Sequence, residues 1–200
     1  PLMIELNKVY RQTDRTFVSI LDHIRTGNTS DQDVALLNER SGQNAALASS
    51  SDFNITLTSR RDRAMAINES QLAELESKKS EFKGSVSGEF PESSLPTDLA
   101  LALKEGAQVM FIANDPNHEW VNGTLGRYLG ANEEFGFIEV ALEDGRECQV
   151  EPYTWENKRY SLNEENNTIE EEVIGRFTQY PLRLAWAITI HKSQGLTFDH

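Results

Sequence analysis

The spacing of hydrophobic residues changes along this chain, from helical periods near the start to short alternating runs in the second half. Apolar residues at helical spacing predict a helix over Arg15 to Thr26, for which Asp14 is a suitable N-cap. The same reasoning predicts a short helix over Asp31 to Asn38 and a strong amphipathic helix over Arg60 to Glu76.

Runs of apolar and β-branched residues predict strands around these helices. Leu2 to Val9 alternates roughly, and Phe53 to Thr58 is rich in β-branched residues. Strand patterns recur at Glu81 to Phe90 and at Ala107 to Ile112. Pro181 to Ala187 is a largely apolar run, which is typical of a central strand in an α/β sheet.

The pattern differs from Gly123 to Phe177, where short runs of alternating apolar and polar residues are separated by turn residues. Asp144-Gly145 between two such runs is a hairpin signal. This stretch predicts a small all-β barrel of about 50 residues, near the lower size limit of a domain. The fold class is therefore predicted as α/β, with one domain over residues 1–124, a β insertion over residues 125–177 and the first domain resumed over residues 178–200.

Composition narrows the class of protein. No apolar run in the 200 residues approaches the roughly 18 that a membrane helix needs, so no membrane partner is expected. One cysteine, Cys148, fits a reducing compartment, and we expect a cytoplasmic protein. The start at Pro1, without Met or a signal peptide, suggests a piece of a longer chain. A net charge of -13 argues against coating of DNA by bulk electrostatics but allows a local basic groove.

Two polar stretches near predicted strand ends are candidate ligand sites. Arg11, between Tyr10 and Gln12, lies just past a predicted strand, where its planar guanidinium can reach a phosphate. Alternatively, Arg11 packs over Tyr10 on the surface. Hydroxyls and an Arg at a helix start, as in Thr56 to Arg60 with Asn68, can hold a backbone phosphate, although plain N-capping by Thr58 or Ser59 is the alternative.

Two further stretches lie later in the chain. Val121 to Gly126 contains Asn122-Gly123, which a turn explains without any ligand, although contact with nucleic acid or a partner is the alternative. A stretch rich in polar residues directly follows an apolar run and ends at Gly195. A helix over Ile188 to Gln194 is the alternative explanation. We interpret this stretch as functional because it offers phosphate contacts and neutral hydrogen bonds together, from Thr189, His191, Lys192, Ser193 and Gln194. Scattered histidines and a single cysteine make a metal cluster unexpected, and no GxxxxGK[ST] loop is present.

Four stretches, which follow one another along the chain in the same order as the family's motifs, resemble motifs of superfamily-one DNA helicases of the Pif family and its RecD-like relatives. PLRLAWAITIHKSQGLTFD, Pro181 to Asp199, resembles the fifth motif. VYRQTDRTFVSILDHIRTG, Val9 to Gly27, resembles the fourth motif and the helix after it. LTSRRDRAMAINESQL, Leu57 to Leu72, is similar to the next segment, and LKEGAQVMFIANDPNHEWVNGTLG, Leu103 to Gly126, is similar to the step before the family's β insertion.

The resemblance implies the second RecA-like domain of an ATP-driven motor, with a small SH3-like insertion. Its partners would be single-stranded DNA, the duplex junction and the first RecA-like domain of the same polypeptide. Arg11 would be catalytic, reaching the γ-phosphate of ATP, and Gln12, Gln194 and Gly195 would lie on the nucleotide side of the cleft.

The resemblance also implies two patches that contact the single strand. One consists of Thr189, His191, Lys192 and Ser193, and the other consists of Thr58, Arg60 and Asn68. The family's phosphate loop and Mg²⁺-binding acids are expected before Pro1, and its sixth motif after His200. We therefore expect that this chain alone does not hydrolyse ATP.

Other functions remain open from sequence alone. A non-catalytic nucleic-acid- or protein-binding module derived from a helicase would suit the charge of -13. A relaxase-linked or recombination-type helicase would carry its distinguishing domains elsewhere. The acidic run from Glu164 to Glu172 is expected to face solvent or a basic partner rather than DNA.

Overall fold

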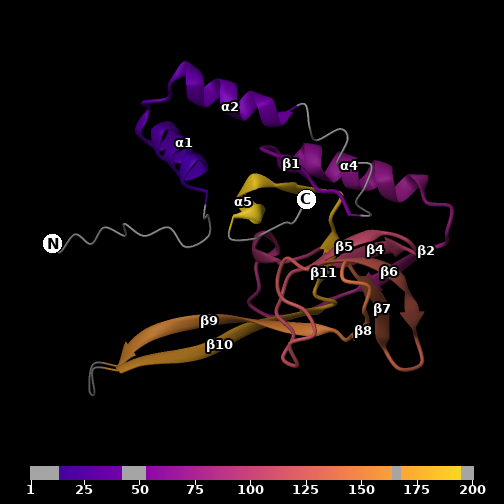
Figure 1. Ribbon diagram of the computed structural model, residues 1–200. Coiled ribbons are helices and arrows are strands. Elements are labelled where there is room, and N and C mark those ends of the chain that lie inside the picture. The colour runs from indigo at the N-terminus through magenta and orange to yellow at the C-terminus, as the bar shows by residue number, and fades with distance from the viewer. Residues whose placement is uncertain (1–13, 42–52, 164–167, 195–200) are drawn as a thin grey trace. The chain divides into compact units, whose positions relative to one another are not determined.

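The computed structural model describes residues 14–41, 53–163 and 168–194. The chain divides into two compact units, Pro1–Ser51 and Asp52–His200 (Figure 1). The predicted strand from Leu2 to Val9 lies outside the described residues. None of the helices described in these three ranges is long and apolar enough to cross a membrane.

The first unit contains two helices that begin at side-chain caps, as the sequence predicts. Helix α1, Arg15–Thr26, starts where Asp14 Oδ1 accepts hydrogen bonds from the backbone N–H groups of Thr16 and Phe17, and it ends at Gly27, whose φ is 73°. A left-handed residue of this kind is the usual helix stop, and glycine adopts it without strain.

Helix α2, Asp31–Ser41, begins with a reciprocal cap. The Ser30 hydroxyl accepts from the Asp33 N–H at 3.2 Å, and Asp33 Oδ2 accepts from the Ser30 N–H at 2.8 Å. These hydrogen bonds from Ser30 are the main cause of a lowered pKa for Asp33. His23 Nδ1 lies 3.0 Å from Asp33 Oδ2, so the same carboxylate also links α2 to α1.

The second unit is mixed α/β and opens with one strand and one long helix. Strand β1 is Thr56–Thr58, shorter than predicted, and helix α4 is Arg61–Glu74. The remaining elements are β2 Lys79–Lys83, β3 Ser85–Gly88, the 3-10 helix Glu92–Ser94, β4 Ala100–Lys104, β5 Gln108–Phe111, β6 Leu125–Asn132, β7 Phe137–Leu142, β8 Glu147–Val150, β9 Tyr153–Asn163, β10 Thr168–Gln179, β11 Leu182–Leu184, β12 Ala187–Thr189 and the short helix α5 Ile190–Ser193.

An antiparallel sheet in the order β11-β5-β6-β7-β8 forms the centre of this unit. Its inward side chains, with those of neighbouring strands, build the main core: β7 buries Ile138, Val140 and Leu142 at every second position. The rings of Phe111 and Trp120 stack in this core with centroids 4.5 Å apart.

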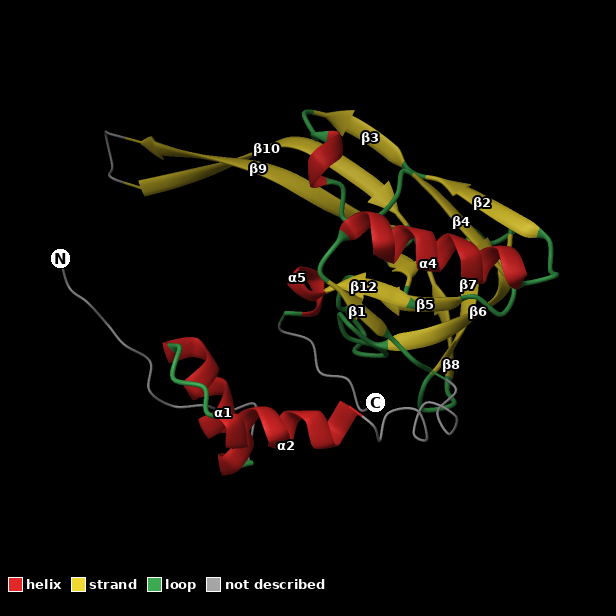
Figure 2. Cartoon of the chain, turned by 90° about the horizontal axis from the view of Figure 1, so that it is seen from above, coloured by secondary structure: helices red, strands yellow, loops and turns green. Residues whose placement is uncertain are grey.

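Strands β9 and β10 form a long hairpin that projects away from the central sheet in both views (Figures 1 and 2). Strand β3 pairs with the base of this hairpin, where Phe177 is fully buried and packs on Trp155. Farther out, Tyr160 and Ile169 are exposed. The acidic side chains at positions 170 to 172 are exposed too, and Lys158 pairs with Glu171.

The predicted boundaries at 124 and 177 stay a prediction, but strand pairing crosses the first and a strand runs through the second. Strand β5, before the first boundary, pairs with β6 after it, and β10 continues past residue 177 to Gln179. Strand β11, after the second boundary, pairs with β5 in the same sheet. The β insertion therefore shares one sheet with segments on either side of it.

The expectation of a single central strand from Pro181 to Ala187 is wrong. The segment splits into β11, which is antiparallel to β5, and β12, which is parallel to β1. Gln108 is buried and stabilises the break at Ala185. Its side-chain Nε2 donates to the Ala185 carbonyl at 2.9 Å, and its backbone carbonyl accepts from the Ala185 N–H at 3.0 Å.

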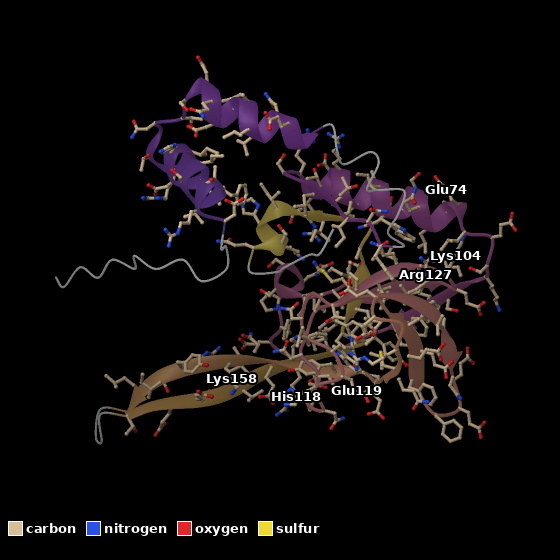
Figure 3. The ribbon with its side chains drawn as sticks, in the orientation of Figure 1. Glu74, Lys104, His118, Glu119, Arg127 and Lys158 are labelled. Atoms are coloured by element: carbon tan, nitrogen blue, oxygen red, sulfur yellow. The ribbon has the colours of Figure 1, made fainter. Side chains whose placement is uncertain are left out.

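Helix α4 is fixed at its C-terminal end by Lys104 from β4 (Figure 3). Its ammonium donates to the Leu75 carbonyl at 2.5 Å and to the Ala73 carbonyl at 3.4 Å. A cation at this end of a helix satisfies free carbonyl groups and opposes the negative end of the helix dipole. The C-terminal end of α4 is thereby tied to β4.

Candidate functional site

The two short strands β1 and β12 bring together stretches that lie far apart in the sequence. They pair in parallel, with Thr58 opposite Thr189. Each strand runs almost directly into a helix, β1 into α4 and β12 into α5. In α/β folds ligands bind outside the carboxyl ends of parallel strands, so the two stretches predicted to contact a single strand meet at the expected edge.

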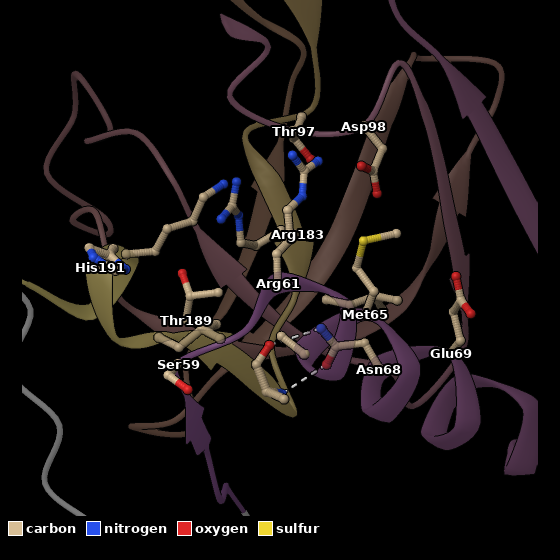
Figure 4. Close-up of a pocket in the computed structure, with 15 residues that line it drawn as sticks. Ser59, Arg61, Met65, Asn68, Glu69, Thr97, Asp98, Arg183, Thr189 and His191 are labelled. Atoms are coloured by element: carbon tan, nitrogen blue, oxygen red, sulfur yellow. Dashed lines mark hydrogen bonds between the residues drawn. The ribbon is translucent and has the colours of Figure 1, made fainter. Parts of the chain in front are cut away.

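Asn68 connects the helix to the strand. Its Oδ1 accepts from the Ala187 N–H at 2.8 Å, and its Nδ2 donates to the Ala187 carbonyl at 2.9 Å (Figure 4). Both polar atoms of the amide therefore satisfy the backbone of β12. This observation gives Asn68 a structural role, and its predicted contact with DNA stays a prediction.

The start of α4 is arranged differently from the predicted cap. Thr58 is buried, and its hydroxyl accepts from the Arg60 N–H at 3.3 Å. Arg60 itself occupies the N-cap position and donates through Nε to Asp62 at 3.0 Å. The helix begins one residue later than predicted. Arg61, and not Arg60, lines the space in front of the strand edge.

That space is a pocket of about 330 Å³ (Figure 4). Its lining includes four residues that the sequence analysis selected, Asn68, Thr189, His191 and Lys192. The other lining residues are Ser59, Arg61, Ala64, Met65, Glu69, Thr97, Asp98, Arg183, Leu184, Ala187 and Ile188.

Arg61 and Arg183 are basic pocket residues that sequence reasoning missed. The signal for Arg183 was available, because it is the one charged residue in the apolar run PLRLAWA. Its Nη2 donates to the Pro96 carbonyl, and its Nε is buried without a hydrogen-bond partner among the described residues. Burial lowers the pKa of this guanidinium from its usual range.

Lys192, which lines the pocket, has a lowered pKa. Desolvation of its ammonium, followed by repulsion from Arg183 and Arg61, lowers its pKa to about 8, and Asp98 opposes the shift. The side chain is nevertheless exposed over part of its length, so the ammonium can meet a ligand from solvent. The pocket therefore concentrates positive charge beside hydroxyl and amide groups.

No family model matches this chain. A protein of Bdellovibrio bacteriovorus called ATP-dependent DNA helicase Pif1 is 32% identical over 201 residues, covering 98% of this chain and 42% of that protein. The human protein called ATP-dependent DNA helicase PIF1 is 32% identical over 212 residues, covering 100% of this chain and 30% of that protein. The chain thus spans less than half the length of these two relatives.

Solved structures give the same result. Bacteroides sp Pif1 in complex with ADP-AlF4 is similar with a TM-score of 0.79 and 38% identity, over 96% of this chain and 43% of that one. Bacteroides Pif1 bound to ssDNA is similar with a TM-score of 0.64 and 39% identity, over 98% of this chain and 44% of that one. The chain belongs to the Pif1 helicase family. Its predicted fold class, mixed α/β of the RecA-like helicase type, is confirmed at that level.

Within this Pif1-family chain, the last predicted stretch contains a short helix. Helix α5 ends at Ser193, whose hydroxyl donates to the Ile190 carbonyl at 2.9 Å, and Gln194 follows as the C-cap. The alternative prediction of a helix over Ile188 to Gln194 is therefore confirmed for Ile190–Ser193, and the observed helix is shorter than predicted. Arg11, Gln12 and Gly195 lie outside the described residues.

Asn122-Gly123 forms the turn that the simpler explanation requires: Gly123 has a φ of 99° and donates to the Phe111 carbonyl. Across the described ranges, no group of His, Cys, Asp or Glu side chains is placed to hold a metal ion. Cys148 is buried, and desolvation raises the pKa of its thiol to about 12, so it remains a neutral core residue.

Proposed function

We propose that this chain is part of an ATP-dependent DNA helicase that moves along single-stranded DNA and unwinds duplex. The observation that carries the proposal is the parallel register of Thr58 with Thr189, which joins the two predicted strand-contact stretches at one edge. The names of the Pif1 relatives and the solved complexes with ADP-AlF4 and with ssDNA support it.

In this proposal the chain supplies half of the ATP cleft and part of the single-strand path. Arg11 would stabilise charge on the transferring γ-phosphate, with Gln12, Gln194 and Gly195 beside the nucleotide. The other half of the cleft would come from the first RecA-like domain of the same polypeptide. Mg²⁺ would accompany ATP, and the family resemblance implies that its ligands lie outside this chain.

The β strands after residue 124 would form an SH3-like module within the motor domain. The five antiparallel strands in the order β11-β5-β6-β7-β8 support this proposal. We keep residues 1–124, 125–177 and 178–200 as the proposed domain division. Strands β5 and β11 would then be the strands through which the motor domain joins the sheet of the module. The duplex junction is proposed as a further partner, and the cytoplasm as the location.

A helicase-derived module that only binds nucleic acid or protein is the competing function, and catalysis separates the two. In the full-length protein that carries this chain, Arg11→Ala should lower DNA-stimulated ATP hydrolysis about 1,000-fold, because a cation on the transferring phosphoryl group contributes at least that much. Binding of single-stranded DNA should stay unchanged.

Arg25→Ala is the matched control, because Arg25 lies on α1 and pairs with Asp22 at 2.6 Å on the surface. It should hydrolyse ATP like the unmodified protein. Full-length protein without DNA-stimulated hydrolysis, or an Arg11→Ala variant as active as the control, would contradict the proposal.

A further inference from the structure

A second pocket, of about 590 Å³, is lined by residues of β7, of β8 and of the loop that follows β5. Five acidic residues line it: Asp115, Glu119, Glu139, Glu147 and Glu151. No lysine, arginine or histidine is among the described residues that line it. This acidic pocket and the pocket at the strand edge have no lining residue in common, so they are separate sites.

The alternation of the sheet places two of the pocket acids. Glu139 on β7 and Glu147 on β8 are exposed, whereas their neighbours Ile138 and Cys148 are buried, so both acids extend from the outer face of the sheet. Glu139 lies opposite Gln149 in the register, which puts Glu147 on the diagonal across the two strands. Two negative charges at this spacing repel each other and favour the approach of a cation.

The loop after β5 holds a third acid in a fixed place. Asp115 is buried, and its Oδ2 accepts hydrogen bonds from the backbone N–H groups of Asn117 at 2.9 Å and Glu119 at 3.1 Å. Arg146 Nη2 donates to the Glu119 carbonyl at 3.1 Å. The Glu119 side chain therefore extends from a backbone that is ordered before any partner binds.

The ion pairs of the chain leave this pocket without a cation. Among the described residues, no basic side chain lies within ion-pairing distance of Glu119, Glu139 or Glu147. Arg146 contacts only the backbone of Glu119, and its charge is paired with Asp144. The negative charge of the pocket is therefore available to a cation from another molecule.

The Trp120 indole adds a hydrogen-bond donor to the same pocket. Trp120 lines the pocket, is 8% exposed, and packs its ring on Phe111. Its Nε1–H is buried and has no hydrogen-bond partner among the described residues. A buried donor without an acceptor is costly and rare in native structures. This N–H therefore indicates an acceptor that the described residues do not supply.

The acids and the indole together define the chemistry of a ligand, which needs positive charge and an oxygen acceptor. A metal ion does not fit, because no group of acids in the described ranges is placed to hold one. Nucleic acid does not fit either, because the carboxylates repel its phosphates. A polypeptide segment with lysine or arginine offers both groups, since its side chains are cations and its main-chain carbonyl oxygens are acceptors.

We propose that the acidic pocket docks a lysine- or arginine-rich segment of a partner protein. Basic side chains of the segment pair with Glu119, Glu139 and Glu147, and one of its main-chain carbonyl oxygens accepts the Trp120 N–H. The inference goes beyond the proposed function, because the pocket shares no residue with the predicted nucleotide and DNA contacts. It assigns this face of the central sheet to protein recognition.

The charge contacts are tested by fluorescence anisotropy with a labelled octa-arginine peptide and the full-length protein that carries this chain. Glu139→Gln and Glu147→Gln should each weaken binding about threefold, a typical effect of losing one exposed ion pair. Glu172→Gln is the matched control, because Glu172 is an exposed acid on β10 that does not line the pocket. Affinities of both pocket variants equal to that of the control would overturn the proposal.

The hydrogen bond is tested with Trp120→Phe, which keeps an aromatic ring on Phe111 but lacks the N–H. Octa-arginine should bind this variant about fivefold more weakly, the usual effect of losing one neutral hydrogen bond. Spermine, a polyamine without a carbonyl group, should bind both proteins equally. Unchanged peptide affinity, or an equal loss for spermine, would overturn the contact with Trp120.

Melting curves show whether Trp120→Phe folds. If it does not, the indole N–H of Trp120 in the unmodified protein is followed by NMR. Its resonance should shift when octa-arginine is added, and a resonance that stays in place at saturating peptide would overturn the contact.

Competition separates a peptide from a small cation. Spermine should not displace octa-arginine at an equal concentration, and displacement there would overturn the assignment to a polypeptide. These titrations use neither ATP nor DNA. A peptide affinity that ignores the pocket variants contradicts only this inference, whereas full-length protein without DNA-stimulated hydrolysis contradicts only the proposed function.

Discussion

Lys192 shows how the neighbours of one side chain can set its response to pH. It faces Arg183 on β11 and Arg61 on α4, with His191 on its own helix and the acids Asp98 and Glu69 elsewhere on the pocket lining. Desolvation and the two guanidinium groups outweigh Asp98, which brings the pKa of Lys192 to about 8. The ammonium is therefore charged at neutral pH but titrates far below the ordinary lysine value of 10.5.

We predict that affinity for single-stranded DNA falls between pH 7 and pH 9, because the charge that meets the phosphate is lost as pH rises through about 8. In Lys192→Arg the charge persists, so its affinity should change much less over this range. Binding isotherms at several pH values check this. A parallel decline in the two proteins would contradict the assignment of the titration to Lys192.

Stability without DNA should change in the opposite direction. Between about pH 8 and 10.5 the unfolded chain holds more protons on Lys192 than the folded chain, so folding stability rises with pH in that window. Denaturant unfolding should show this rise for the unmodified protein and a smaller one for Lys192→Met.

At the scale of elements, the contact between α4 and β12 depends on the Asn68 amide. Asn68→Ala removes two hydrogen bonds and leaves the Ala187 backbone groups unpaired, so we expect the free energy of unfolding to fall by about 2 kcal/mol. Ser70→Ala, an exposed change on the same helix, should have little effect on denaturant unfolding. A stable Asn68→Ala variant that binds DNA poorly would instead support the direct DNA contact predicted from sequence.

Elements defined by local signals could be predicted from the sequence. Asp14 and Gly27 mark the ends of α1, and Asp144-Gly145 marks a turn, because caps and turns are settled by a few neighbouring residues. The sequence did not distinguish the long β9–β10 hairpin from the predicted barrel. Apolar and polar residues alternate in its outer part as they do in a barrel strand, yet apolar residues such as Tyr160 and Ile169 are exposed.

Features that depend on distant residues could not be predicted. The break at Ala185 is set by Gln108, and the pairing of Thr58 with Thr189 joins opposite ends of the unit. The family resemblance selected Arg60, and this contact stays a prediction, whereas Arg61 is the arginine of this stretch that lines the pocket. Neighbouring residues on a helix point about 100° apart, so only the packed structure shows which of the two faces the pocket.

At the scale of the whole molecule, a net charge of -13 requires that attraction for DNA be local. A few unpaired cations in a pocket can supply this attraction, whereas the remaining surface repels a polyanion. The protein should therefore discriminate against nucleic acid that does not enter the site.

The salt dependence of binding measures how many phosphates the site neutralises. Each phosphate contact to a single strand contributes about 0.7 to the slope of log affinity against log salt concentration. We predict that Arg61→Met lowers the slope of the full-length protein by about this amount, whereas Arg63→Met leaves it unchanged. Titrations at four or more salt concentrations check this, and equal slopes for the two variants would contradict a phosphate contact at Arg61.

The parallel pairing of β1 with β12 also governs when this part of the molecule can be assembled. Strands β5 to β8 are neighbours in sequence and close short loops, so they can pair while the chain is still being synthesised. Strand β12 is made after every other strand that the structure describes. A growing chain can thus complete most of its β-sheet on the ribosome, whereas the edge at which Thr58 pairs with Thr189 forms only after translation has passed Thr189.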